Sequence, residues 1–544
     1  MAKPHFRAGT AGRNRNRIGG RFALRASALA LLAVLAGAPA WATAPAAYPA
    51  PQLDFTPEQL ALAEAVRHDP DLAAFYGGNG LRPVFSGTEG AARREALAEA
   101  VAQAPRHGLP PARYAMPQAT TGGALDEVAL ASVFVRWAND LTRGLLDPRK
   151  VDPHVKRAPE GVDAGRALAD FAAAADPRAA MEALAPDHPF YLALQNALTE
   201  GPALIAPAGT PPAPAGLWKP GMRDPALADL RARLAAIGFD PGTGEADLYD
   251  AGLAEAVTRF QQAAGLGADG VAGPRTIARL NGSASDAQRD ILMAMERWRW
   301  LPEDLGQRHV WVNLPEYTTR IVQDEQVIFQ TRSVIGKAAA DFETPEFSDE
   351  MEFLVFNPAW NVPRSITVRE YLPRLKANPN AVGHIDIVDS RGRVVPRSQI
   401  DFSRYTAANF PYRMRQKPSD DNALGQVKFL FPNEWNIYLH DTPTRWLFNE
   451  TRRAFSHGCI RIHDPLDLAA ELLSPQLADP RASIRSALSR EGEQWVRMTP
   501  TIPVHLVYFT TFPDADGRLR HAPDIYGRDT RLWQALSQAG LGDA

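Results

Sequence analysis

The sequence predicts a multidomain α+β protein: a helical domain, a small three-helix module, and a mainly-β domain that is interrupted by an insertion. Apolar residues recur at helical spacing in the first part of the chain, whereas short β-type runs dominate after about residue 290. The length of 544 residues is typical of about three domains. The composition, 45% hydrophobic and 22% charged, excludes a chain that is mostly disordered.

The N-terminal segment 1–42 has the pattern of a secretory signal peptide. A stretch with seven Lys and Arg residues and no acidic residue precedes an apolar run at 26–37, and small residues follow it. We expect cleavage after Ala42, because a cut two residues earlier or later would leave Trp41 or Pro45 as the first residue. The alternative is an uncleaved anchor, although the apolar run is shorter than the roughly 20 residues that span a bilayer.

Cleavage would make the chain strongly acidic. The net charge is −3, and loss of the seven basic residues leaves 52 basic and 62 acidic residues, a net charge of −10. Such a chain is a poor candidate for nucleic-acid binding. No later segment has the pattern of a membrane span, so we expect a monomer in the periplasm with no membrane span after cleavage.

Residues 43–200 are expected to form a helical scaffold domain. Leu62 and Val66, for example, lie on one helical face, and no cluster of catalytic residue types occurs in this part of the chain. A linker follows at 201–221, where the frequent prolines are incompatible with a helix or a central strand.

Residues 222–282 predict three short helices in a compact module. Glycines end the first two helices, and an Asp269-Gly270 turn precedes the third. The segment resembles the peptidoglycan-binding module of secreted cell-wall proteins. The residues that carry the resemblance are Val257, Phe260, Gln261, Gly265, Leu266, Asp269, Gly270, Gly273, Thr276, Leu280 and Asn281. The alternative is an unrelated small helical bundle with a tight Asp-Gly turn.

Residues 283–535 are expected to form the mainly-β domain. Ser283 and Asp286 have capping-box spacing at the start of a helix. Between the β-type runs, residues 363–424 form a long polar insertion with a helical pattern at 368–375, and such an insertion indicates a lid or a binding loop. The predicted strands lie at 310–314, 320–322, 327–329, 333–335, 352–356, 426–431, 437–439 and 504–509.

Reactive residue types gather in the second half of this domain. Cys459, the only cysteine of the chain, lies two residues after His457 and nineteen after His440. A histidine on an adjacent strand can act as the base for the thiol, since the thiolate is the reactive form. Gly458 permits an unusual backbone conformation beside the nucleophile, and nearby N–H groups can stabilise an oxyanion. These residues therefore predict an acyl-transfer site.

Two other interpretations of the cysteine stay open. Cys459 could be a small buried apolar residue, which is the usual role of a free cysteine. It could also join His457, His463 and Asp464 in a zinc site, because these residue types bind zinc. The 457/459 spacing is tight, however, and no paired Cys-x-x-Cys or His-Glu-x-x-His pattern supports a metal.

His440, fifteen intervening residues, and then Ser456-His457-Gly458-Cys459 with Arg461 resemble the catalytic signature of L,D-transpeptidases, which have a YkuD-type fold. One departure is Phe342-Glu343, which stands where the large periplasmic YcbB-like subfamily usually has Arg-Gln. The resemblance to this subfamily covers essentially the whole chain after the signal peptide. Its further segments are 296–302, 312–315, 357–363, 422–432, 440–443, 503–508 and 524–526.

The resemblance implies an enzyme that cross-links peptidoglycan, with stem peptides and glycan as its partners. Cys459 would attack the carbonyl of the third residue of a donor stem, and the amine of a second stem would resolve the thioester as a 3→3 linkage. No metal or organic cofactor would be needed, and carbapenems would be inhibitors. The alternatives are an L,D-carboxypeptidase, which uses water as the acceptor, and a non-catalytic peptidoglycan-binding protein.

The resemblance also implies roles for the site residues. His440 would accept the thiol proton, and Asp441 would orient its imidazole through the carbonyl or the side chain. His457 would be a weaker candidate for the base, or would hold the turn through a backbone hydrogen bond. Arg461 would bind a stem carboxylate or form a structural ion pair. The remaining substrate-binding candidates are Ser456, Tyr438 and Trp360, with core packing as the competing role for Trp360.

Overall fold

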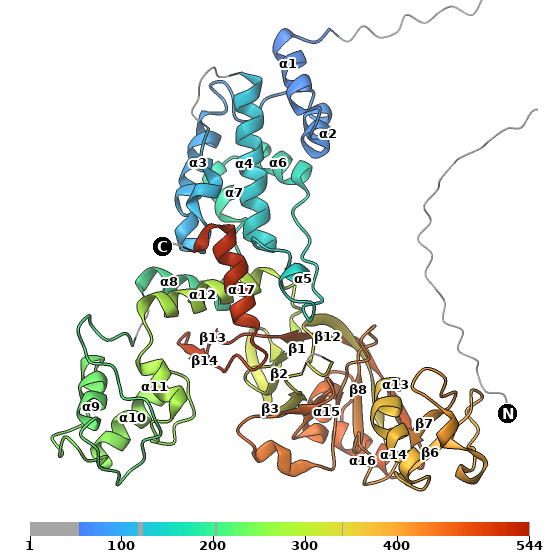
Figure 1. Ribbon diagram of the computed structural model, residues 1–544. Coiled ribbons are helices and arrows are strands. Elements are labelled where there is room, and N and C mark those ends of the chain that lie inside the picture. Colours follow the sequence, from blue (N-terminus) through green and yellow to red (C-terminus); the bar gives the residue numbers. More distant parts are fainter. Residues whose placement is uncertain (1–53, 118–122, 202–203, 340, 543–544) are drawn as a thin grey trace, which may run out of the picture. The chain divides into compact units, whose positions relative to one another are not determined.

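The computed structural model describes residues 54–117, 123–201, 204–339 and 341–542 (Figure 1). The predicted signal peptide lies outside these residues. From Phe55 onward the chain forms one compact unit. Within the described ranges, no helix has both the length and the apolar character needed to cross a membrane.

The first part of this unit is a helical domain, as the apolar spacing predicts. The twenty-residue helix α4 is its centre, and the inner face of α4 buries Phe134 and Trp137. Glu127, also on α4 and buried, accepts a hydrogen bond from Tyr76 Oη at 2.6 Å and so ties α4 to α2. The helices are α1 (Pro57–Val66), α2 (Pro70–Gly78), α3 (Ala91–Ala102), α4 (Ala124–Arg143), α5 (Pro148–Val151), α6 (Ala164–Ala173), α7 (Pro177–Glu182) and α8 (Pro189–Glu200).

The three predicted helices of the small module are present. They pack around a core of their own that includes Leu230 and Phe260. Gln261 holds the Asp-Gly turn in place, because its Oε1 accepts from the Gly270 N–H at 2.9 Å and its Nε2 donates to Asp269 Oδ1 at 2.9 Å. The helices are α9 (Leu227–Ala236), α10 (Ala251–Ala263) and α11 (Pro274–Leu280).

Helix α12 (Ala284–Arg299) begins at the predicted capping box of Ser283 and Asp286. It does not pack on the β-domain alone. Trp298 of α12 shares a hydrophobic core with Tyr191 of α8, so α12 connects the helical domain to the β-domain.

The β-domain is built on a nine-stranded sheet in the order β10-β3-β11-β9-β8-β4-β12-β1-β2. An additional pairing between β2 and β3 closes the sheet on itself, and the enclosed core includes Leu354, Phe429 and Leu439. Closure leaves few unpaired strand edges. The strands are β1 (Arg308–Asn313), β2 (Thr318–Gln323), β3 (Gln326–Gly336), β4 (Phe347–Phe356), β8 (Val427–Leu430), β9 (Leu439–His440), β10 (Ala454–Ser456), β11 (Ile460–Ile462) and β12 (Gln494–Val507).

Several strand predictions were wrong in extent. Strand β4 starts five residues before the predicted 352–356, and β9 lies at 439–440 where 437–439 was predicted. The runs at 327–329 and 333–335 form one continuous strand, β3, because the polar residues between them pair with β2. Strand β12 starts ten residues before the predicted 504–509, since its exposed first half pairs with β4. Two helices after the cysteine, α15 (Pro465–Leu473) and α16 (Pro480–Leu488), were not predicted, and both contribute to the core of the β-domain.

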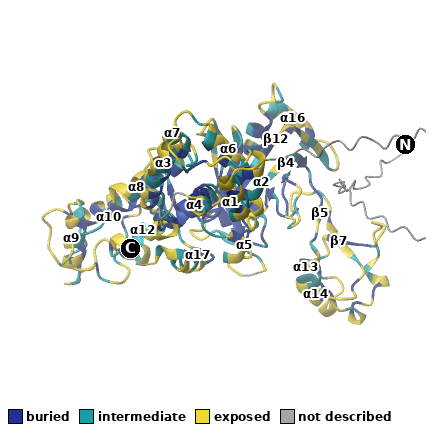
Figure 2. Cartoon of the chain, turned by 90° about the horizontal axis from the view of Figure 1, so that it is seen from above, coloured by how far each residue is buried: buried dark blue, intermediate teal, exposed yellow. Residues whose placement is uncertain are grey.

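The insertion 363–424 is a small folded subdomain rather than a loop. Its core includes Leu375, Ile385 and Met414. Figure 2 shows that most of its ribbon, near the labels α13, α14, β5 and β7, is exposed or intermediate. The three-stranded sheet β5-β7-β6 was not predicted, whereas the helical pattern at 368–375 was. The elements are β5 (Trp360–Asn361), α13 (Arg364–Ile366), a π-helical turn (Thr367–Tyr371), α14 (Leu372–Ala377), β6 (Ile385–Val388) and β7 (Arg413–Gln416).

The C-terminal segment returns to the helical part of the chain. A short hairpin of β13 (Thr511–Pro513) and β14 (Leu519–His521) precedes helix α17 (Arg528–Leu536). Figure 1 shows α17 beside α12. Leu532 of α17 is buried in one cluster with Met293 of α12.

Candidate active site

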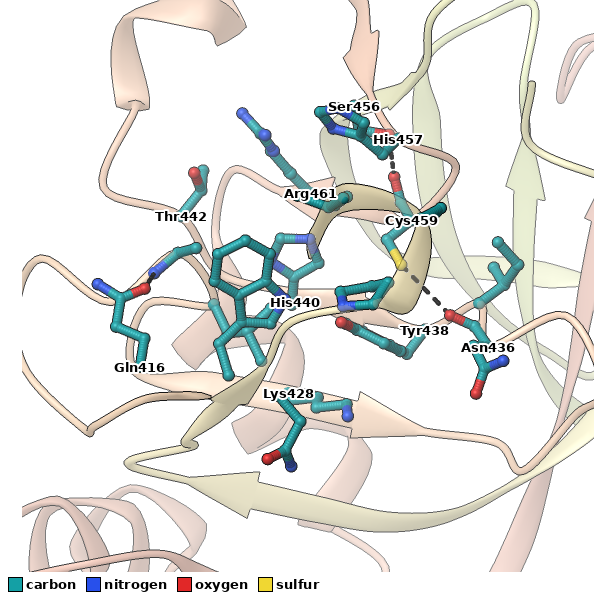
Figure 3. A pocket seen from close by; sticks show the side chains of 18 of the residues that line it. Gln416, Lys428, Asn436, Tyr438, His440, Thr442, Ser456, His457, Cys459 and Arg461 are labelled. Atoms are coloured by element: carbon teal, nitrogen blue, oxygen red, sulfur yellow. Dashed lines mark hydrogen bonds between the residues drawn. The ribbon is translucent and has the colours of Figure 1, made fainter. Parts of the chain in front are cut away.

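A cavity of about 950 Å³ lies between the closed sheet and the insertion. The sheet and its loops contribute Tyr438, His440, Cys459 and Arg461, and Figure 3 shows these four side chains around one opening. The insertion and the strand that leads into it contribute Trp360, Glu370, Tyr371, His384 and Gln416. The cavity therefore brings the predicted reactive residues together and places the insertion over them.

Cys459 lies in the tight turn between β10 and β11. Its Sγ is 3.6 Å from the carbonyl oxygen of Asn436. Gly458 has a φ of +113°, and a Cβ at this position would lie 3.2 Å from Ile437 Cδ1, so both conformation and space favour glycine here. Ser456 closes the turn, because its Oγ donates to the Cys459 carbonyl at 2.5 Å and accepts from the Gly458 N–H at 3.1 Å. Ser456 thus shapes the turn from inside.

His440 is held beside the cysteine by strand pairing. Strand β9 is parallel to β11, with Leu439 opposite Ile460 and His440 opposite Arg461. The Nδ1 of His440 lies 2.5 Å from the backbone carbonyl of Asp441. A carbonyl oxygen can only accept, so Nδ1 carries the proton and Nε2 is left to accept one.

Asp441 orients His440 through its backbone and not through its carboxylate. The carboxylate instead accepts from the N–H groups of Gln426 at 2.9 Å and Thr442 at 2.6 Å, and it pairs with Arg445 at 2.8 Å. Of the two possibilities left open by the sequence, the structure therefore shows the carbonyl.

The two central groups are both uncharged at neutral pH. Burial lowers the pKa of His440 to about 3, and the charges of Arg461 and Lys428 add to this shift. Burial raises the pKa of the Cys459 thiol, although hydrogen bonds with Tyr438 and the charge of Lys428 oppose that rise. The site thus holds a neutral thiol beside a neutral imidazole.

Lys428 is a site residue that the sequence analysis missed. It lies opposite His440 in the pairing of β8 with β9, and its Nζ lies 3.9 Å from the centre of the Tyr438 ring. The signal in the sequence was a lysine inside the otherwise apolar run 426–431. Lys428, His440 and Arg461 form one row across three neighbouring strands, so a cation stands on each side of the histidine.

Arg461 is partly buried and has few partners. Its Nη1 donates to Thr444 Oγ1 at 2.9 Å, and its buried Nε has no hydrogen-bond partner. Among the described residues, no carboxylate lies within ion-pair distance of Arg461. The structural ion pair considered from the sequence is therefore not formed, and the charge remains available to an anionic ligand.

His457 faces the insertion and not the thiol. Its Nε2 lies 2.6 Å from Oε1 of Glu370, which belongs to the π-helical turn of the insertion. Its ring also packs edge-to-face against Phe342, with the ring centres 4.8 Å apart. The partner of His457 is thus a carboxylate, whereas the sequence analysis considered a backbone group, and Glu370 was not foreseen at all.

The residues considered for zinc do not converge. The Nδ1 of His463 lies 2.8 Å from Asp464, and its Nε2 accepts from Arg332 at 2.8 Å, so both ring nitrogens are engaged. In the part of the chain that the structure describes, no three His, Cys, Asp or Glu side chains are arranged to hold a metal ion.

A thiol and a neutral histidine in one cavity beneath a capping subdomain are the arrangement expected of a thiol-dependent catalytic domain. Comparison with known families agrees: residues 307–484 match the "L,D-transpeptidase catalytic domain" of the YkuD family. Residues 70–198 match a "Scaffold domain", and residues 223–280 match a "Putative peptidoglycan binding domain".

Individual relatives are also named as L,D-transpeptidases. A Haemophilus influenzae protein named "Putative L,D-transpeptidase" is 32% identical over 250 residues, which cover 46% of this chain and 50% of that protein. The chain thus spans about half the length of this curated relative. Solved L,D-transpeptidases from Xylanimonas cellulosilytica and Stackebrandtia nassauensis are 17% and 15% identical. Each alignment covers 55% of this chain, with 100% and 97% of the solved chains and TM-scores of 0.16 and 0.20, so the assignment rests on the domain match instead.

Proposed function

We propose that the chain is a peptidoglycan L,D-transpeptidase that forms 3→3 cross-links through a thioester on Cys459. The observation that carries the proposal is the arrangement of Cys459 and His440 in one cavity, with the unprotonated Nε2 fixed by the bond from Nδ1 to the Asp441 carbonyl. The match of residues 307–484 to the L,D-transpeptidase catalytic domain supports it.

In the first half-reaction, Nε2 of His440 takes the thiol proton while Sγ of Cys459 bonds to the carbonyl carbon of the third stem residue. The carbonyl electrons move to the oxygen, and the N–H of Cys459 is the donor that stabilises this oxyanion. The intermediate then collapses: the bond to the terminal D-Ala nitrogen breaks, and His440 returns the proton to the leaving amine. A thioester remains on Cys459.

In the second half-reaction, the side-chain amine of another stem attacks the thioester. His440 takes a proton from that amine, the new amide bond forms, and the thiolate leaves and is protonated again. Arg461 and Lys428 supply positive charge for the carboxylates of the stems. Tyr438 and Trp360 line the same cavity and would form its walls around the donor.

The rest of the chain fits the same substrate. The module at 223–280 would bind peptidoglycan, as the family match suggests, and the segment 1–42 would direct the chain to the periplasm. The reactive thiol and its oxyanion donor would also make the protein a target of carbapenems, since a strained β-lactam carbonyl can acylate the thiol.

Mass spectrometry of products from purified protein and defined tetrapeptide muropeptides tests the proposal. The expected product is a dimer joined by a 3→3 bond, with release of D-Ala. Tripeptides with free D-Ala and no dimer would show an L,D-carboxypeptidase instead. Intact muropeptides that bind without reaction would show a non-catalytic peptidoglycan-binding protein.

A further inference from the structure

Thr344 lies buried behind the catalytic turn, and all of its polar groups are hydrogen-bonded. Its N–H donates to Tyr526 Oη at 3.3 Å, and its carbonyl accepts from Arg528 Nη2 at 3.0 Å. Its hydroxyl oxygen accepts from the Gly336 N–H at 3.0 Å. The hydroxyl proton is then directed to one acceptor, the carbonyl oxygen of Gly458 at 2.7 Å.

That carbonyl belongs to the same peptide unit as the N–H of Cys459. A trans peptide is planar, and its carbonyl and N–H point in opposite directions. The bond from Thr344 to the Gly458 carbonyl therefore also sets the direction of the Cys459 N–H. Within the described ranges, this N–H has no protein acceptor, whereas the Gly458 N–H is bound to Ser456 Oγ.

We propose that Thr344 is a positioning residue that aims the Cys459 N–H at the oxyanion formed when the thiol is acylated. The inference rests on the proposed function only for its acyl-transfer chemistry. When Sγ bonds to a carbonyl carbon, the π electrons of that carbonyl move to its oxygen, and an N–H held in the correct direction stabilises the charge without reorganisation.

Thr344 is itself held by a buried guanidinium. Arg528, only 2% exposed, pairs with Glu346 at 2.7 Å and with Glu343 at 3.2 Å while it donates to the Thr344 carbonyl. Its guanidinium also lies over the rings of Tyr508 and Tyr526, at 4.8 Å from each centre. This accounts for one residue of the departure noted in the sequence: Glu343 is a counter-charge to Arg528 and does not line the cavity, whereas Phe342 does.

Residues of the helical domain also contact the groups that hold Thr344. Asp152, directly after α5, lies 3.7 Å from Arg528 Nε and is itself bound by Arg531. The following segment joins the β-domain, since the Lys156 N–H donates to the Glu346 carbonyl at 2.8 Å. The helical domain therefore contributes directly to the shell that holds Thr344.

The test compares Thr344→Val, which keeps the shape and removes the hydroxyl, with Thr344→Ser, which keeps the hydroxyl. Two rates are measured by intact-protein mass spectrometry: acylation by a carbapenem, which needs an oxyanion donor, and alkylation by iodoacetamide, which does not. Thr344→Val should slow acylation by about tenfold to a hundredfold and leave alkylation unchanged. Thr344→Ser should restore acylation to within about threefold. Thr258→Val, which removes a hydroxyl bond inside α10, is the matched control.

Three results would overturn the inference: acylation of Thr344→Val at the wild-type rate, an equal loss in both reactions, or a wild-type chain that is alkylated but not acylated. If Thr344→Val does not fold, Tyr526→Phe removes the bond to the Thr344 N–H, and a loss confined to acylation is again expected. Unchanged acylation in that variant would also overturn the inference. A wild-type protein that is acylated but forms no muropeptide dimer would contradict the proposed function and leave this inference standing.

Discussion

The Nδ1–H of His440 donates to the carbonyl oxygen of Asp441 at 2.5 Å, and this single bond leaves Nε2 as the ring nitrogen that can accept a proton. Lys428 and Arg461 flank the imidazole on the neighbouring strands and disfavour its protonation. In the proposed mechanism the histidine is therefore a neutral base that takes a proton during attack. It is not half of a preformed thiolate–imidazolium pair.

This relationship predicts the pH dependence of alkylation of Cys459. Burial raises the pKa of the thiol and lowers that of His440 to about 3, so neither group changes charge between pH 5 and 8. The thiolate fraction, and with it the iodoacetamide rate, should rise about tenfold per pH unit across this range. A short unstructured peptide with one cysteine is the control. Its rate should reach a plateau at a lower pH than the rate of the protein does, because its thiol has the lower pKa. A rate that is flat between pH 5 and 8 would contradict this prediction, because it would show that the reacting form of the thiol is already fully present at pH 5.

Lys428 and Arg461 are predicted to recognise the carboxylates of the donor stem. Replacement of Lys428 by Met should raise KM for the donor about tenfold and change kcat less, because the lost charge contacts the ligand and not the reacting atoms. Lys428→Arg should recover most of the loss. A donor with amidated carboxyl groups is the control. Its KM should be the same for wild type and Lys428→Met, because it carries no carboxylate for the lysine to bind. An unchanged KM for the acidic donor in Lys428→Met would rule out this role.

The bond between His457 and Glu370 should hold the insertion over the cavity. Glu370→Ala removes it, and we expect KM for the donor to rise about threefold to tenfold while kcat stays within about twofold. Lys376→Ala, an exposed change on the adjacent α14, should alter neither constant. A fall in kcat alone for Glu370→Ala would instead place His457 in the chemistry of the thiol.

Asp152 should contribute to stability in a pH-dependent way. Burial raises the pKa of its carboxyl, but hydrogen bonds from His154 and Arg531 and the charge of Arg528 outweigh this and lower it. A carboxyl whose pKa is lower in the folded state stabilises that state at pH values above its pKa in the unfolded chain, which is about 3.9. This stabilisation is lost as the pH falls from there toward the pKa of the folded state. Asp152→Asn should thus cost about 1–3 kcal/mol of unfolding free energy at pH 7 and progressively less toward pH 3.

Thermal or urea unfolding of wild type and Asp152→Asn at several pH values measures this difference. Asp147→Asn is the matched control, because Asp147 is an exposed N-cap of α5 and asparagine caps as well. A difference for Asp152→Asn that stays constant from pH 7 to pH 3 would show that its charge is not the source of the effect.

Local patterns in the sequence predicted much of the fold. Capping at Ser283 and the Asp269-Gly270 turn depend on neighbouring residues, so they were predictable. The sheet of the insertion was not, because Trp360 and Gln416 pair across more than fifty residues, and β5 is only two residues long. Helices α15 and α16 follow the reactive turn. Leu468 and Leu472 of α15 have helical spacing, so this helix was predictable from a local pattern.

The same distinction applies to the site. Cys459 and His440 were predictable as candidates, because a lone cysteine near histidines is a chemical signal within one segment. Lys428 and Glu370 reach the site only through the closure of the sheet and the fold of the insertion, so their roles depend on contacts distant in sequence. Thr344 reaches Gly458 across more than a hundred residues for the same reason.

The proposed mechanism requires that Cys459, deprotonated by His440, carries the acyl group of a stem peptide. The most direct measurement is intact-protein mass spectrometry of the enzyme quenched during turnover with a defined tetrapeptide donor. We expect one acyl adduct per chain, located on Cys459, absent from Cys459→Ala, strongly reduced in His440→Ala, and followed by a 3→3 dimer once an acceptor is added. A folded Cys459→Ala protein that still forms the dimer would contradict this mechanism.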